Sequence, residues 1–167
     1  DMTPLFETIV NYIPAPQGDE NAPLQVLIST IDYNEYVGRI GVGKIDNGSI
    51  RVNQDAIMVN HHDPDKRQKV KISKLYEFDG LNKVEVDEAG TGSIVAISGI
   101  ADLHIGDTLC SPEHVEAIPF QKISEPTISM QFRVNDSPLA GREGKFVTSR
   151  HLRDRLFREL NTDVSLR

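Results

Sequence analysis

Short runs in which apolar and polar residues alternate cover the middle of the chain, and this pattern is typical of half-buried strands. Between residues 24 and 112 the runs are rich in β-branched residues and are separated by residues that favour turns. The expected strands are residues 24–33, 36–45, 50–52, 55–60, 69–78, 83–89, 92–100 and 107–112. Many short strands joined only by turns indicate an antiparallel barrel or sandwich. Glycines within residues 36–45 favour the barrel, because glycine is common where strands bend or coil tightly.

Turn residues in this region predict how the strands connect. Asn47-Gly48 is a strong signal for a tight hairpin, so we expect residues 44–45 to pair with residues 50–52. The polar residues 64–69 are interpreted as a turn. We expect no helix longer than two turns between residues 24 and 109.

The first residues have a helical pattern instead. The i, i+3, i+4, i+7 spacing of an amphipathic helix is met by Phe6, Ile9, Val10 and Ile13. Thr3 can cap this helix, and Pro4 suits its first position. Prolines at positions 14 and 16 end it, and residues 14–23 are interpreted as a linker.

Beyond residue 112 the pattern changes again. Prolines at positions 119 and 126 place a boundary between residues 115 and 125. Residues 127–134 alternate and are expected to form a strand, an arginine-rich helix follows a glycine-containing loop, and residues 163–167 begin a further strand. The apolar stripe of the helix consists of Leu152, Leu156 and Leu160. A second stripe has ion-pair spacing, which predicts that Asp154 pairs with both Arg150 and Arg158.

Composition limits the class of protein. The 167 residues are 26% charged and 38% hydrophobic, as in an ordinary globular protein, and no apolar run approaches the ~18 residues of a membrane-spanning helix. No signal peptide is visible at the N-terminus. The single cysteine, Cys110, excludes an internal disulfide framework and suits a reducing cytoplasm. A lone cysteine after an apolar run is more often a small core residue than a nucleophile.

Positive charge is concentrated in two places, although the formal net charge is −7. Residues 142–167 carry seven basic and four acidic residues, a net charge of +3, which leaves −10 for residues 1–141. Clustered charge sets the local potential that a polyanion meets. The candidate RNA or ribosome contacts are Lys66, Arg67, Lys69, Lys71, Arg142, Lys145, Arg150 and Arg153. The alternative for each cluster is a solvated face.

Other candidate chemistry has little support. His61-His62-Asp63 with Asp65 resembles a metal cluster, but adjacent side chains of an extended segment point to opposite sides. The loop "GREGK" offers flexible backbone and two cations to a phosphate, yet it is not a P-loop, because Lys145 is followed by Phe146 rather than Ser or Thr. We find no hydrolase, zinc-protease or dinucleotide motif.

Two stretches together resemble a known family. "VGRIGVGKIDNGSIRVNQ" (37–54) and "EAGTGSIVAISGIADLHIGDTLC" (88–110) are similar to the second, β-barrel domain of translational GTPases. "EGKFVTSRHLRDRLFRELNTDVSLR" (143–167) resembles the third domain of the BipA/TypA branch. "MTPLFETIVNYIPAP" (2–16) looks like the last helix of the GTPase domain of that branch.

The resemblance implies a mainly β fold: a translation-factor-type antiparallel barrel followed by a partial ferredoxin-like α+β unit. The implied domains are residues 1–21, the last GTPase-domain helix and a linker; residues 22–118, the barrel; and residues 119–167, a β-α-β part of the third domain. The chain is then an interior fragment without its GTPase domain. It would itself have no catalytic, cofactor or metal site, and GTP and Mg²⁺ would belong to the intact protein.

The resemblance also implies partners: the ribosome through its rRNA, the GTPase domain in cis, and no membrane. The intact protein would be a cytoplasmic translation factor linked to stress responses. We expect a monomer that can self-associate through the incomplete third domain, and that domain should be less stable than the barrel. One alternative is a standalone nucleic-acid- or small-ligand-binding barrel, for which only Tyr33, Tyr36, Tyr76 and Phe78 offer stacking surfaces. Another is an enzyme that uses Cys110 or the histidines.

Overall fold

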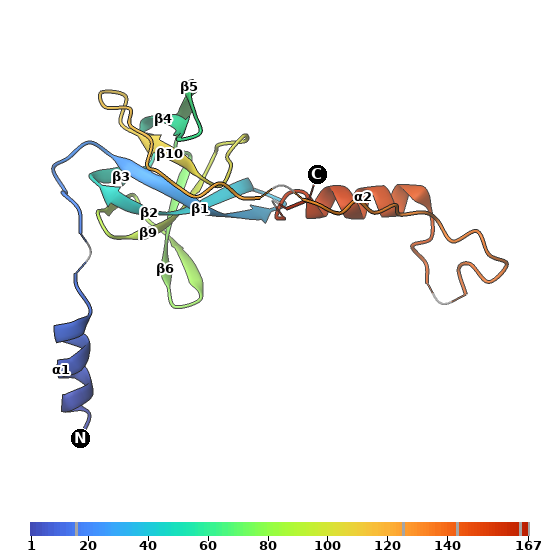
Figure 1. Ribbon diagram of the computed structural model, residues 1–167, viewed down its shortest axis with the longest axis horizontal. Helices are drawn as coiled ribbons and strands as arrows, with labels where there is room; N and C mark the ends of the chain where they lie inside the picture. The colour runs from blue at the N-terminus through green and yellow to red at the C-terminus, as the bar shows by residue number, and fades with distance from the viewer. Residues whose placement is uncertain (16, 125, 143, 164, 167) are drawn as a thin grey trace.

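Ten antiparallel strands between residues 25 and 110 form a barrel, seen in Figure 1. The structure is a computed structural model that describes residues 1–15, 17–124, 126–142, 144–163 and 165–166. The strands are β1 (Gln25–Asn34), β2 (Gly38–Asn47), β3 (Ser49–Arg51), β4 (Asp55–Asn60), β5 (Asp63–Lys71), β6 (Lys74–Asp79), β7 (Asn82–Glu85), β8 (Glu88–Gly90), β9 (Ile94–Ser98) and β10 (Asp107–Cys110). Eight of them follow the order β5-β4-β10-β1-β2-β9-β6-β7, and β3 pairs with β8.

The β3–β8 pair closes the barrel between the two edges of the eight-stranded sheet. After β3, the Asn53 N–H donates to the carbonyl of Ile72, and the Ile72 N–H donates to the carbonyl of Gln54, which ties this pair to the end of β5. Before β8, the Val86 N–H donates to the carbonyl of Leu75 in β6. The closed wall surrounds a core of inward-facing aliphatic side chains. Those that are fully buried include Val26, Ile28, Ile45, Ile72, Leu75, Ile97 and Leu109.

Close approach between β1 and β2 depends on glycine. A Cβ atom added at Gly43 would overlap the carbonyl oxygen of Leu27 in the neighbouring strand. Register shifts between Gln25 and Val26 and between Ile28 and Thr30 bend β1 along the same contact. Of the glycines that favoured a barrel, Gly43 therefore lies where two strands pack without room for a side chain, whereas Gly38 has open space around it.

The sequence pattern located most strands, but it divided some of them wrongly. The expected strands at 24–33, 36–45, 55–60, 92–100 and 107–112 are confirmed by β1, β2, β4, β9 and β10. The expected strand 69–78 is two strands, and the expected turn at 64–69 is part of β5. Residues 83–89 also divide into β7 and β8. No helix lies between residues 24 and 109, as expected.

The expected hairpin at Asn47-Gly48 is wrong. Gly48 does turn the chain with a φ of 71°, but β3 pairs with β8 and not with β2. The Gly48 N–H donates to the carbonyl of Asp19 at 2.9 Å, and Thr91 donates its hydroxyl to the Gly48 carbonyl at 2.9 Å. The linker and the β8–β9 turn therefore hold this turn in place of a partner strand.

A strap of residues 116–120 covers the outer side of β10. The Ile118 N–H donates to the Thr108 hydroxyl at 3.0 Å, and the Cys110 thiol donates to the carbonyl of Glu116 at 3.2 Å. Phe120 packs its ring edge-on against His62, with ring centres 4.9 Å apart, and leaves no room for a side chain at Gly106. Burial raises the pKa of the Cys110 thiol. Cys110 is thus a buried residue beneath the strap, and its environment disfavours the thiolate form that a nucleophile needs.

Two helices flank the barrel. Helix α1 (Thr3–Tyr12) is confirmed, but the residue before it, Met2, occupies the cap position, and the Thr3 hydroxyl bonds Asp1 instead. Helix α2 (Ser149–Glu159) is capped by Thr148, which accepts the His151 N–H. Neither helix has a buried residue, and no described helix is long and apolar enough to cross a membrane.

The strand expected at residues 127–134 is not formed. A strand needs a hydrogen-bonded neighbour, and within the described residues no segment pairs with this one. Its apolar side chains Ile128, Met130, Phe132 and Val134 are exposed. The strand expected at 163–167 falls partly outside the described residues, and residues 163, 165 and 166 are not in a strand. The β-α-β unit is therefore represented here by its helix, and the domain limits at 21 and 118 stay predictions.

Gly43→Ala should lower the free energy of unfolding by about 1–3 kcal/mol, because the new methyl group meets backbone that no rotamer change can move. Gly90→Ala is the matched control, since nothing lies within 4 Å of a Cβ atom at that position and its φ is not positive. Its effect should stay below about 1 kcal/mol in either direction. Urea unfolding of both variants measures the difference, and equal destabilisation would contradict the close approach of β1 and β2.

Cys110 should react with a thiol reagent at least about a hundredfold more slowly in the folded chain than in urea, because access requires opening of the strap. Thr108→Val removes the acceptor of the Ile118 N–H and should speed the labelling of the folded chain severalfold. Labelling of the folded wild type at the rate of a free thiol would show that the strap does not cover Cys110.

Candidate nucleic-acid interface

The basic residues of β5 divide between the two sides of the barrel wall. The regular part of β5 pairs with β4 in the register Gln68↔Met58, Lys69↔Ile57, Val70↔Ala56 and Lys71↔Asp55. Val70 and Ala56 are buried in the core, and successive residues of a strand face opposite sides. Lys69 and Lys71 therefore point away from the core.

Arg67 lies on the same outer side, two residues before Lys69. Burial raises the pKa of Cys110, and the Arg67 charge is close enough to offset part of this rise; the Cys110 thiol lies beneath the strap on the outer side of β10. We call Arg67, Lys69 and Lys71 together the cationic face. All three are exposed, and the strap covers β10 next to them. The open outer surface in this part of the barrel is thus that of β4 and β5.

An acid from β4 lies within the cationic face. Asp55 accepts an ion-paired hydrogen bond from the Lys69 ammonium at 2.9 Å. This bond, with the charges of Lys69 and Lys71, holds the pKa of Asp55 below its ordinary value. Arg67 donates from Nε to the carbonyl of Pro64 at 3.4 Å, a long bond that leaves the rest of its guanidinium facing outward.

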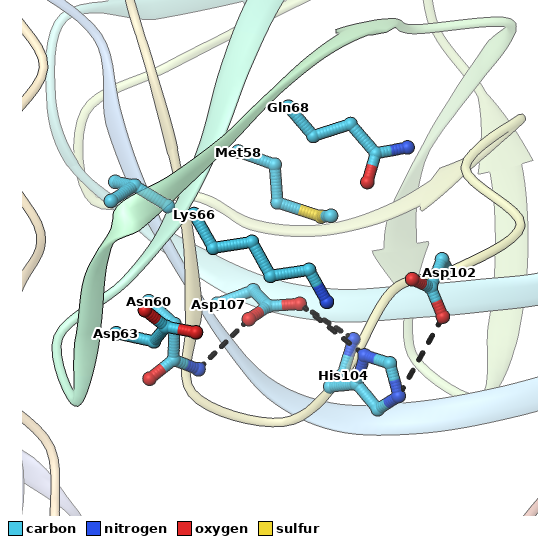
Figure 2. A pocket seen from close by; sticks show the side chains of 9 residues that line it. Met58, Asn60, Asp63, Lys66, Gln68, Asp102, His104 and Asp107 are labelled. Carbon is cyan, nitrogen blue, oxygen red and sulfur yellow. Dashed lines mark hydrogen bonds and ion pairs between the residues drawn. The ribbon is translucent and has the colours of Figure 1, made fainter.

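Lys66 belongs to a different place, a polar pocket at one end of the barrel (Figure 2). Buried Asp107 accepts from the Asn60 side chain at 2.9 Å and from the His104 N–H at 2.8 Å, which joins the ends of β4 and β10. The His104 ring lies 3.8 Å from both Asp102 and Asp107. The three carboxylates that line the pocket, Asp63, Asp102 and Asp107, disfavour phosphate there, and Lys66 lies apart from the other predicted contacts of β5.

The second basic cluster lies on the loop before α2 and on α2 itself. Arg142 and Lys145 are exposed on the loop. On the helix, Arg150 lies 4.0 Å from Asp154, as its spacing predicted, and Arg153 lies over the ring of Phe157 at 5.3 Å. Two of the four predicted contacts in this cluster therefore already have intramolecular partners.

The structure does not bring the two clusters together. In Figure 1 the loop before α2 lies at the end of the helix far from the barrel, whereas β5 is part of the barrel wall. The other end of α2 meets the barrel, where Arg158 pairs with Glu35 in the β1–β2 turn at 3.1 Å. The expected pairing of Arg158 with Asp154 is thus wrong, because Glu35 takes its guanidinium. Arg155 pairs with Glu159 along the helix.

The arrangement of the histidines in the structure does not support a metal site. Among the described residues, no group of three or more His, Cys, Asp or Glu side chains is placed to hold a metal ion. His62 packs on Phe120, and its Nε2 lies 3.2 Å from the carbonyl of that residue. His62 therefore anchors the strap.

Residues 38–110 match the family model described as Elongation factor Tu domain 2. All 167 residues align with proteins called Large ribosomal subunit assembly factor BipA. The chain is 53% identical to the protein of a Synechocystis species, of which it spans 28%. It is 46% identical to that of Salmonella typhimurium and 43% identical to that of Bacillus subtilis, and it spans 27% of each.

The family match at residues 38–110 lies within the barrel, and the identity to the relatives extends over the whole chain. The chain covers well under two thirds of these relatives, so it corresponds to one part of them. The chain belongs to the BipA family, and its barrel is of the elongation factor Tu domain 2 type.

Proposed function

We propose that this chain is a non-catalytic, ribosome-binding and domain-coupling part of a BipA-like translational GTPase. The observation that carries the proposal is the cationic face, where Arg67, Lys69 and Lys71 project from one strand on the open outer side of the barrel. The name of the relatives, a ribosomal subunit assembly factor, supports a ribosomal partner. We propose that the cationic face contacts the phosphates of rRNA.

Electrostatics favour a local rather than a general affinity for RNA. Phosphate contacts depend on local cations and their released counterions, whereas residues 1–141 together carry a net charge of −10. Such acidity opposes RNA binding over the rest of the surface. Three cations on one strand of a closed barrel keep their spacing, which limits the entropy cost of binding.

The loop cluster is proposed as a second, weaker contact. Arg142 and Lys145 lie on a loop outside any strand or helix, so binding must order the backbone that carries them. Arg150 and Arg153 must give up Asp154 and Phe157 or share them. The alternative for this cluster is a surface facing the GTPase domain.

Two features support the proposed coupling role. The pair between Arg158 and Glu35 links α2 to the β1–β2 turn. The exposed apolar side chains of α1, among them Phe6 and Val10, suit packing against a GTPase domain in cis.

We place GTP and Mg²⁺ in the GTPase domain of the intact protein. We place the intact protein in the cytoplasm, with no membrane partner and with the implied link to stress responses. The exposed apolar residues of 128–134 favour self-association of an otherwise monomeric chain.

Changing Arg67, Lys69 and Lys71 to Gln in the intact protein should weaken ribosome association and flatten its dependence on salt. Removing one phosphate contact lowers the log–log slope by about 0.7–0.9, so the slope of the triple variant should fall by about 2–3 units. Reversing Arg142 and Lys145 to Glu should lower the slope by less than the triple variant does, because that loop is not held in place. Sedimentation with ribosomes across a salt series measures all three proteins.

The matched control changes three cations elsewhere on the barrel, Lys44, Lys74 and Lys83, to Gln. This control removes the same charge, so a purely global electrostatic effect would weaken binding equally. Identical slopes for the wild type and the β5 variant would refute the cationic face as the contact. Identical curves for the wild type and the loop variant would leave the loop as a solvated surface.

The purified chain should neither bind GTP nor hydrolyse it. No segment of the sequence supplies the run of backbone amides with a lysine and a hydroxyl that holds a β-phosphate and its Mg²⁺. Calorimetry with GTP and Mg²⁺ tests this expectation. Saturable binding in the micromolar range would show that the chain contains a nucleotide site of another kind.

A further inference from the structure

Asp55 is the one acid that β4 contributes to the cationic face, and its position is set by backbone pairing. The register places it directly across from Lys71, while its carboxylate reaches the neighbouring outward side chain, Lys69, at 2.9 Å. Both members of the pair are accessible, with 67% of the Lys69 side chain and 51% of the Asp55 side chain exposed. A ligand that approaches the cationic face therefore meets Lys69 already engaged by an anion.

The spacing of the three cations suits a regular array of phosphates. Two residues of a strand span about 6.6 Å, so Lys69 and Lys71, in the regularly paired part of β5, lie about that far apart along the strand, and Arg67 precedes Lys69 by two residues. This interval is comparable to the distance between successive phosphates of one nucleic-acid strand. Asp55 engages the middle cation of the row, so its carboxylate lies against the ammonium group that a phosphate would have to contact.

We propose that Asp55 is a built-in competitor for phosphate on the cationic face, which admits the ordered backbone of helical RNA and disfavours flexible or isolated phosphates. This inference rests on the proposed function of the same face. A helical RNA presents neighbouring phosphates at fixed positions, so contacts with Arg67 and Lys71 help its middle phosphate to displace Asp55. A flexible strand must give up conformational entropy to do the same.

Two observations support this reading. The Asp55 carboxylate is charged at neutral pH, as any ordinary aspartate is, and lies 2.9 Å from the Lys69 ammonium, so that it competes as an anion. Phe120, the aromatic residue of the adjacent strap, is turned onto His62 and Gly106 and offers no platform for an unstacked base. Recognition at this face then depends on phosphate positions, the feature by which proteins recognise double-stranded RNA.

The test compares Asp55→Asn with the wild-type chain on two probes, a labelled RNA hairpin and an unstructured RNA oligonucleotide of the same length, across a potassium chloride series. The variant should bind both probes more tightly, by about two- to fivefold, since an exposed ion pair of this kind no longer has to be broken. The gain should be larger for the unstructured probe, and the log–log slope should steepen by about 0.7–0.9 for that probe alone, because only it gains a phosphate contact.

Asp46→Asn is the matched control, because Asp46 forms the comparable Lys44–Asp46 pair on β2 at 3.2 Å and its change removes the same charge. An equal gain in affinity for Asp55→Asn and Asp46→Asn would reduce the effect to net charge and overturn the inference. Urea unfolding of both variants checks that the barrel is intact.

Lys69→Gln distinguishes failure of the competitor role from failure of the RNA site itself. If Lys69→Gln and Lys71→Gln bind both probes as the wild type does, or if no form of the chain binds either probe, the cationic face is not an RNA site and both proposals fail. If the lysine variants bind more weakly but Asp55→Asn matches the wild type, the competitor role alone fails. The double variant Asp55→Asn/Lys69→Gln should show no gain over Lys69→Gln, because the lysine that Asp55 engages is absent.

Discussion

Burial of Val70 and Ile72 is the constraint on which both the barrel and its candidate site depend. Both side chains lie in the core, and the backbone of Ile72 bonds to residues 53 and 54 to close the wall. A register slip of one residue would turn Val70 outward and drive Lys69 and Lys71 inward. Burying an unpaired ammonium group costs several kcal/mol, so this alternative is excluded. The packing that closes the barrel thus also aims two lysines at solvent.

The part of the fold that could be predicted is the part set by local pattern. Short apolar runs bounded by turn residues located β1, β2, β4, β9 and β10, because each strand contributes side chains to the core. Asn47-Gly48 turned the chain as predicted, but its strand partner is decided by closure, which brings β8 to β3 from a position about forty residues away. The prediction of a turn at residues 64–69 was wrong because the local pattern there does not resemble a strand. An edge strand with an exposed outer side and few apolar residues has the composition of a turn, and only pairing with β4 makes it a strand.

The candidate site was predicted in composition but not in geometry. The concentration of basic residues along the sequence identified those of β5. It could not show that Lys66 points into the pocket with Asp107 while Lys69 points outward. Asp55 was missed because it precedes Lys69 by fourteen residues and meets it only across the β4–β5 ladder. Helical spacing gave Asp154 as the partner of Arg150 correctly, but it could not anticipate Glu35, which reaches Arg158 from the barrel. Contacts within one element follow from spacing, whereas contacts between elements need the register.

The two basic clusters differ most in how rigidly the structure holds them. This difference affects how the barrel and α2 can be coupled. The cationic face is fixed to a closed wall, whereas α2 meets the barrel through a pair whose side chains are 68% and 66% exposed. Such a pair contributes about 0–1 kcal/mol, since solvent screens it and both side chains are restrained. Changing the orientation of α2 relative to the barrel therefore costs little free energy at this contact. A partner that contacts both clusters at once would set that orientation with a small part of its binding energy, because the exposed Arg158–Glu35 pair opposes the movement only weakly. The stiff barrel then fixes where the chain binds, and the weakly held helix is the part that can respond to what is bound.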